Sequence, residues 1–168
     1  QRWSLTRTKE LPPEHDFTGQ APRIGVWVCN CGINIGGVAD VPAVRDYAAT
    51  LPYVAHVEEK LFTCSQDSQD HMKDVIREHR LNRIVVAACS PRTHEPLFQE
   101  TIRDAGLNRY LFEMANIRDQ NTWVHMKDPE KATQKAKDLV RMAVAKAAFI
   151  EPLHQVSLPI KKAILIIG

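Results

Sequence analysis

The 168-residue sequence has little cysteine, little net charge and no long apolar run. Its four cysteines are too few for a small secreted scaffold held together by disulfides. The formal net charge of +2 gives no electrostatic reason to expect a nucleic-acid partner. No apolar run approaches the roughly 20 residues that a membrane-spanning helix needs, and no secretory signal pattern is present. We therefore expect a cytoplasmic protein with no membrane span.

Common catalytic motifs are missing as well. The sequence contains no P-loop, no Ser-His-Asp arrangement and no recognisable pair of catalytic carboxylates. The histidines do not have metal-ligand spacing, and His94, although close to Cys89, is better explained as a capping or surface residue. We expect no bond-making chemistry from this chain alone.

What the sequence does contain is an alternation of apolar, β-branched runs with helical patterns. Strands are predicted at residues 23–29, 54–62, 83–89 and 110–115. Helices are predicted after Asp40, after Ser65 or Asp67, and over about 95–105 and 129–150. This order predicts an α/β fold: a three-layer, Rossmann-like domain around a mostly parallel sheet of about four strands.

Composition divides the chain into three parts. Residues 1–22 lack apolar periodicity and contain three prolines, which predicts a flexible arm that docks, if at all, through Trp3 and Phe17. Residues 23–152 form the α/β domain. Residues 153–168 are interpreted as a linker and a strand that ends on Gly168. That strand either opens a further, truncated dinucleotide-binding unit or is the last strand of this domain's own sheet, and the residues alone do not separate the two.

The four cysteines stand at related places in this pattern. Cys29 ends the first predicted strand and Cys89 ends the third, whereas Cys64 follows the second and Cys31 lies two residues after Cys29. The carboxyl ends of parallel strands share one edge of the sheet, where ligands usually bind. The thiols are therefore predicted to converge there, although they are far apart in sequence.

Four chemistries are open to such a group of thiols. Four thiolates commonly hold an iron–sulfur cluster. Structural zinc also uses four cysteines, but usually as two C-x₂₋₄-C pairs, and here the only close pair is a C-x-C. A thiol–disulfide site lacks its usual C-x-x-C, and cysteines can also simply fill a core. The pattern favours the cluster and leaves zinc, thiol redox chemistry and plain packing open.

Several neighbours of the thiols suit a cluster. Gly32, Gly36 and Gly37 allow backbone N–H groups to approach bridging sulfurs, and Asn34 lies in the same loop. Arg92 and Arg118 are candidates for offsetting the negative charge of a four-thiolate site, with ordinary surface arginines as the alternative.

A family resemblance adds to this interpretation. It rests on several separated motifs in order, namely VCNCGINIGGVADV, LPYV followed by FTCS, RIVVAACSPRTHEPLFQ, AGLNRYLFEMANIRDQNTWVH and ATQKAKDLVRMAVAKA. From Arg23 to its end, the chain resembles the amino-terminal domain of the A-type (HdrA-like) subunit of heterodisulfide reductase. The resemblance implies that Cys29, Cys31, Cys64 and Cys89 bind a [4Fe–4S] cluster.

The resemblance also implies a context for that cluster. In this family the domain precedes a thioredoxin-reductase-like FAD domain and ferredoxin-type modules, and the whole protein takes part in flavin-based electron bifurcation. Residues 163–168 would then open the FAD domain, so FAD is expected only in the full-length protein. The expected function is electron relay, with other subunits and an iron–sulfur donor or acceptor protein as partners. The alternative is a subunit-docking module with structural zinc or free thiols.

Overall fold

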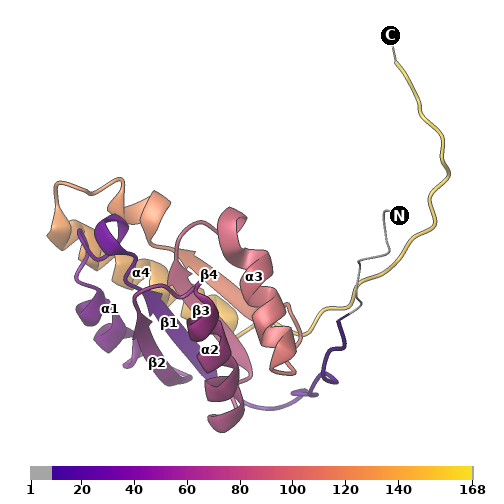
Figure 1. Cartoon of the computed structure of the whole chain (residues 1–168), viewed down its shortest axis with the longest axis horizontal. Coiled ribbons are helices and arrows are strands. Elements are labelled where there is room, and N and C mark those ends of the chain that lie inside the picture. The colour runs from indigo at the N-terminus through magenta and orange to yellow at the C-terminus, as the bar shows by residue number, and fades with distance from the viewer. Residues whose placement is uncertain (1–8, 168) are drawn as a thin grey trace.

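The computed structural model describes residues 9–167, and its strands and helices alternate along the chain (Figure 1). The elements are, in order, β1 (Ile24–Cys29), η1 (Gly32–Asn34), α1 (Val41–Ala48), β2 (Val54–Lys60), α2 (Gln66–Glu78), β3 (Arg83–Ala88), α3 (Pro91–Asp104), β4 (Phe112–Asn116), η2 (Arg118–Thr122) and α4 (Pro129–Ala147). Here η1 is a short 3₁₀ turn and η2 is a short π-helix.

The four strands form one sheet in the order β2-β1-β3-β4, and all neighbouring pairs are parallel. Every residue of β1 and β3 is buried, which explains why these two central strands are the most continuously apolar runs in the sequence. The predicted α/β fold with a parallel four-stranded sheet is therefore confirmed.

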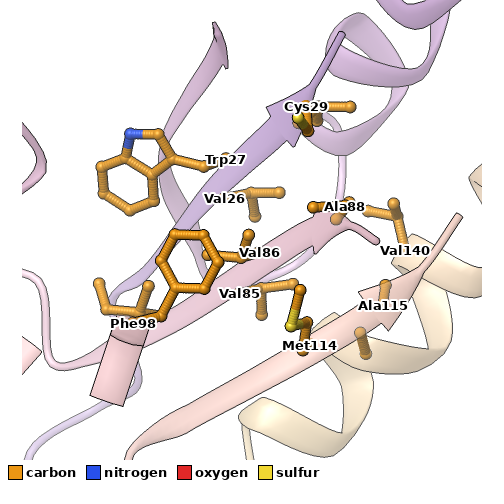
Figure 2. Packing of buried hydrophobic residues seen from close by; sticks show 14 of the residues in the cluster. Val26, Trp27, Cys29, Val85, Val86, Ala88, Phe98, Met114, Ala115 and Val140 are labelled. Atoms are coloured by element: carbon orange, nitrogen blue, oxygen red, sulfur yellow. The ribbon is translucent and has the colours of Figure 1, made fainter. Parts of the chain in front are cut away.

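Helices cover both faces of the sheet, so the domain has three layers (Figure 1). Helices α1 and α4 pack together on one face, and α2 and α3 pack together on the other. Figure 2 shows the resulting core: Trp27 and Phe98 fill one side of the central strands, and Val140 of α4 fills the other. Each layer buries its apolar face against the sheet, as a two-sided parallel sheet requires.

Local sequence signals explain most element boundaries. The Asp40 side chain accepts a hydrogen bond from the Ala43 amide (3.0 Å) and so caps α1 as predicted. Ser65 stands at the N-cap position of α2, but its hydroxyl donates to the Phe62 carbonyl oxygen instead of capping the helix. Helix α3 begins at Pro91 and not near residue 95, because proline suits a first helical turn where its missing N–H is not needed.

Two flanking segments have no helix or strand. Residues 9–22 are held on the domain by an ion pair between Lys9 and Asp104 (2.6 Å) and by the packing of Phe17 against the core. Trp3 and the rest of residues 1–8 lie outside the described residues. Residues 151–167 contain no strand and do not join the sheet, so the alternative that the segment from Lys161 onwards is its last strand is wrong. That residues 163–168 open a further unit stays a prediction, and Gly168 lies outside the described residues.

Candidate functional site

The connections of the sheet diverge between β1 and β3. From β1 the chain passes through α1 to β2 on one side, and from β3 it passes through α3 to β4 on the other. In open α/β sheets the crevice at the carboxyl end of such a switch point is the usual binding place. Cys29 is the last residue of β1, and Cys89 directly follows β3. Two thiols therefore flank the switch point itself.

All four cysteines are free thiols, and the structure brings them to this edge. Cys29 and Cys89 are buried in the core cluster, with 4% and 8% of their surface exposed. Cys31 and Cys64 are half-buried and pack against the same cluster. Figure 2 shows Cys29 at the tip of β1, near Ala88 at the tip of β3. The predicted convergence at the carboxyl edge is thus a feature of the fold.

The electrostatic environment of the thiols reflects the same proximity. Burial raises the pKa of the Cys29 thiol, and the neighbouring Cys31 and Cys64 raise it further against hydrogen bonds from Thr63 that favour the thiolate. Burial also raises the pKa of Cys89, with Cys29 and Cys64 adding to the rise and the positive charge of Arg118 opposing it. Burial and neighbouring thiols therefore favour the protonated form of Cys29 and of Cys89.

The loop after β1 is tightly folded around Cys31. The Cys31 carbonyl oxygen accepts hydrogen bonds from the amides of Asn34 (3.0 Å) and Ile35 (3.2 Å). A Cβ on Gly37 would lie 2.8 Å from the Ile33 Cα, so only glycine fits there without moving the backbone. The amides of Gly32 and Gly37 donate to carbonyl oxygens within this loop, at 2.7 and 2.8 Å, and are thus already engaged.

The two candidate arginines have different positions. Arg92 is exposed in the first turn of α3. Arg118 is partly buried at the start of η2, where its charge acts on Cys89 and its guanidinium pairs with Asp119 (3.2 Å). Of the two, Arg118 is the one whose charge acts on a thiol. His94 packs edge-to-face against Phe98, which gives it a packing role.

Three residues of the site were not singled out from the sequence. Thr63 acts to lower the pKa of the Cys29 thiol, and Thr122 and Trp123 contact the cysteine loop through Asn34. Thr63 stands directly before Cys64, a position that could have drawn attention to it. Thr122 and Trp123 gave no such signal, because their contact with residue 34 depends on the completed fold.

Two other features are absent from residues 9–167. No group of three or more His, Cys, Asp or Glu side chains in this part of the chain is arranged to hold a metal ion. No helix among the same residues is long and apolar enough to cross a membrane.

Strand β2, which leads to Cys64, carries a partly buried carboxylate. Partial burial acts to raise the pKa of Glu58, but hydrogen bonds from His71 (2.8 Å) and the neighbouring Lys60 (3.2 Å) outweigh it and lower the pKa. Trp27 Nε1 also donates to this carboxylate at 3.2 Å. Glu58 therefore joins the core, through Trp27, to α2 and to the end of β2.

We expect Glu58→Gln to lower the free energy of unfolding at pH 7 by about 1 kcal/mol. The folded-state pKa lies below the unfolded value, so this stabilisation is present above the unfolded pKa and is lost as pH falls towards the folded one. Urea denaturation at pH 7 and at pH 3 measures this stabilisation. The difference in the free energy of unfolding between the native chain and the variant should become smaller at the lower pH. Glu10→Gln, at an exposed position outside the helices, is the control, and a gap independent of pH would contradict the prediction.

Comparisons with known proteins bear on this site. No protein-family model matches the chain. The chain is 56% identical over 151 residues to the A-type subunit of the H(2):CoB-CoM heterodisulfide,ferredoxin reductase of Methanothermobacter thermautotrophicus, a match covering 90% of this chain and 23% of the relative. It is 52% identical over 149 residues to the second A-type iron-sulfur subunit of the CoB--CoM heterodisulfide reductase of Methanopyrus kandleri, covering 89% of this chain and 23% of that relative.

A third relative is more distant. The A-type subunit of the ferredoxin:CoB-CoM heterodisulfide reductase of Methanosarcina mazei is 49% identical over 146 residues, which are 87% of this chain and 18% of that protein. These identities extend over nearly the whole chain, so they confirm the resemblance seen in its motifs. The chain spans about a quarter of the length of the first of these relatives, and over nearly its whole length it is homologous to a part of the A-type heterodisulfide reductase subunits.

Proposed function

We propose that this chain binds a [4Fe–4S] cluster through Cys29, Cys31, Cys64 and Cys89 and passes single electrons through it. The observation that carries the proposal is the gathering of four free thiols at the switch point of a parallel sheet. Three of the relatives' names describe an iron-sulfur subunit. When bound, the cluster supplies one-electron redox chemistry with no bond-making step.

The donor set fits such a group. Thiolates are the usual ligands of iron–sulfur clusters, and four are present with no disulfide among them. A cubane binds each cysteine through a different iron, so its ligands need not meet at one point. A structural zinc ion usually takes its four cysteines as two C-x₂₋₄-C pairs, whereas the only close pair in this chain is a C-x-C. The donor set therefore favours a cluster over a structural zinc.

The protein's own contribution is burial and charge. Cys29 and Cys89 lie inside the core and keep water away from one side of the site. Thr63 acts against burial to lower the pKa of the Cys29 thiol, and Arg118 places a positive charge near Cys89. Burial, hydrogen bonds to sulfur and nearby charge are the means by which a protein sets a cluster's potential.

The wider assignment follows the relatives and is part of the same proposal. We propose that the electrons pass to or from the flavin of a heterodisulfide-reductase-type complex. Its other subunits and an iron–sulfur donor or acceptor protein would be the partners. FAD itself would be bound outside the described residues, and flavin-based electron bifurcation would require that longer protein.

Metal analysis tests the proposal directly. The chain should be purified without oxygen, and its iron, acid-labile sulfide and zinc should be measured together with a visible spectrum. We expect about four irons and four sulfides per chain, as in a cubane, and a brown protein. One zinc with no sulfide, in a colourless protein, would overturn the cluster assignment.

A docking module is the second candidate, and one observation favours it. Exposed apolar side chains project from the loops that follow β1, β2 and β4, at the edge where the cysteines lie, namely Ile33, Leu61, Phe62, Trp123, Val124 and Met126. Exposed apolar clusters often mark interaction surfaces. A colourless zinc or metal-free protein that still binds its partner subunits would support docking without electron transfer.

A further inference from the structure

The segment after β4 has an uncommon local geometry. In η2 the amide of Thr122 donates to the Ile117 carbonyl oxygen (3.3 Å), and that of Trp123 donates to the Arg118 oxygen (3.1 Å). Both bonds span five residues, which defines a π-turn, a feature often found at functional sites. The Asn116 side chain starts the turn by accepting from the amides of Arg118 (3.2 Å) and Asp119 (2.9 Å).

This geometry brings Arg118 and Trp123 together. In an α-helix of 3.6 residues per turn, side chains five apart point roughly 140° away from each other. A π-turn has more residues per turn, so side chains five apart point in more similar directions. The Arg118 guanidinium carbon accordingly lies 4.9 Å from the centroid of the Trp123 ring. Asp119 holds the same guanidinium at 3.2 Å. Arg118 is therefore fixed from two directions and does not extend freely into solvent.

The same turn is tied to the cysteine loop. The Thr122 hydroxyl donates to the Asn34 carbonyl oxygen at 2.6 Å, and Trp123 Nε1 donates to the Asn34 side-chain oxygen at 3.3 Å. Thr122 is completely buried. Asn34 in turn donates its amide to the Cys31 carbonyl oxygen. A short chain of hydrogen bonds thus runs from η2 to the backbone of Cys31.

We propose that Arg118, Thr122 and Trp123 form a clamp that positions the cluster site. On one side the clamp fixes the loop that carries Cys31, and on the other it holds the Arg118 charge beside Cys89. These are positioning residues, and their role toward a cluster rests on the proposed function. The first of two tests needs no cluster, so failure of the clamp and failure of the proposed function can be told apart.

The first test measures the loop in the metal-free chain. Thr122→Val keeps the side-chain shape but removes the hydroxyl donor to Asn34. We expect the amides of Asn34 and Ile35 to exchange with solvent deuterium about five- to tenfold faster, the factor that corresponds to losing one buried hydrogen bond. Thr50→Val is the control for the substitution itself, because the exposed Thr50 also donates to a backbone carbonyl (2.8 Å) but lies away from the cysteines.

The second test measures the reduction potential of the loaded chain. Arg118→Gln removes a positive charge that favours the more negative, reduced form, so the potential should fall. We expect a shift of about tenfold in the one-electron equilibrium, or about 59 mV. Arg118→Lys should restore most of it. Arg141→Gln removes the same charge from the exposed face of α4 and should leave the potential unchanged.

Two results would overturn the clamp. Equal exchange of the Asn34 and Ile35 amides in Thr122→Val and the native chain would show that the hydrogen bond does not hold the loop. An equal potential in Arg118→Gln and Arg141→Gln would show that Arg118 acts only through the total charge of the protein. If the chain takes up no iron but Thr122→Val still loosens the loop, the proposed function fails and the positioning of the loop stands.

Discussion

Replacing any one of the four cysteines by serine is expected to abolish stoichiometric cluster binding, reducing iron and sulfide from about four each per chain to well below one. A serine hydroxyl is a much poorer iron ligand than a thiolate, and clusters of this type use all four positions. The four thiols come from three different strand ends, so no other cysteine can replace a missing one. Anaerobic iron and sulfide analysis of the four variants measures this.

The two buried positions need a matched control. Serine at Cys29 or Cys89 also buries a hydroxyl, which can destabilise the fold and lower iron content indirectly. Ala115→Ser introduces a hydroxyl at a comparably buried site near the end of β4, 5% exposed, without removing a thiol. This control should keep its iron. Full iron in Cys31→Ser or Cys64→Ser would contradict four-cysteine ligation and favour a single reactive thiol.

The parts of the site that follow strands were predictable, and the reason is topological. Cys29 and Cys89 end apolar runs, and parallel strands bring such ends to one edge whatever the intervening sequence. Register and element order then follow from the alternation of strands and helices. The fold class and the gathering of the thiols could for this reason be predicted from the order of elements alone.

The clamp and the flanking contacts could not be predicted in the same way. The bond from Thr122 to Asn34 joins residues 88 positions apart, and it depends on how a π-turn orients one hydroxyl. Lys9 pairs with Asp104 across 95 positions, and no local pattern indicates that partner. Glu58 and Glu59 look like the solvated end of a strand, yet the structure pairs them with Lys60 and Arg45. Side-chain contacts of this kind depend on tertiary geometry and not on periodicity.

Trp27→Ala is expected to lower the free energy of unfolding by about 3–5 kcal/mol, the usual cost of truncating a large aromatic side chain in a core. Trp27 is fully buried in the central strand β1, and its ring lies so close to Gly25 that a Cβ there would come within 2.7 Å of it. The loss is large against the roughly 5–15 kcal/mol that stabilises a typical domain. Urea or thermal denaturation of the metal-free chain measures it.

The same substitution should also weaken the thiol edge. Residues two apart in a strand face the same side, so Trp27 and Cys29 both point towards the layer that contains α2 and α3. The cavity that the missing indole leaves in Trp27→Ala allows the end of β1 to move, and Cys29 moves with it. Trp27→Phe is the comparison variant: it keeps most of the apolar packing, loses the hydrogen bond to Glu58 together with the second ring of the indole, and should cost clearly less. Equal stability losses in the two variants would mean that the Glu58 bond, and not the packing, anchors this strand.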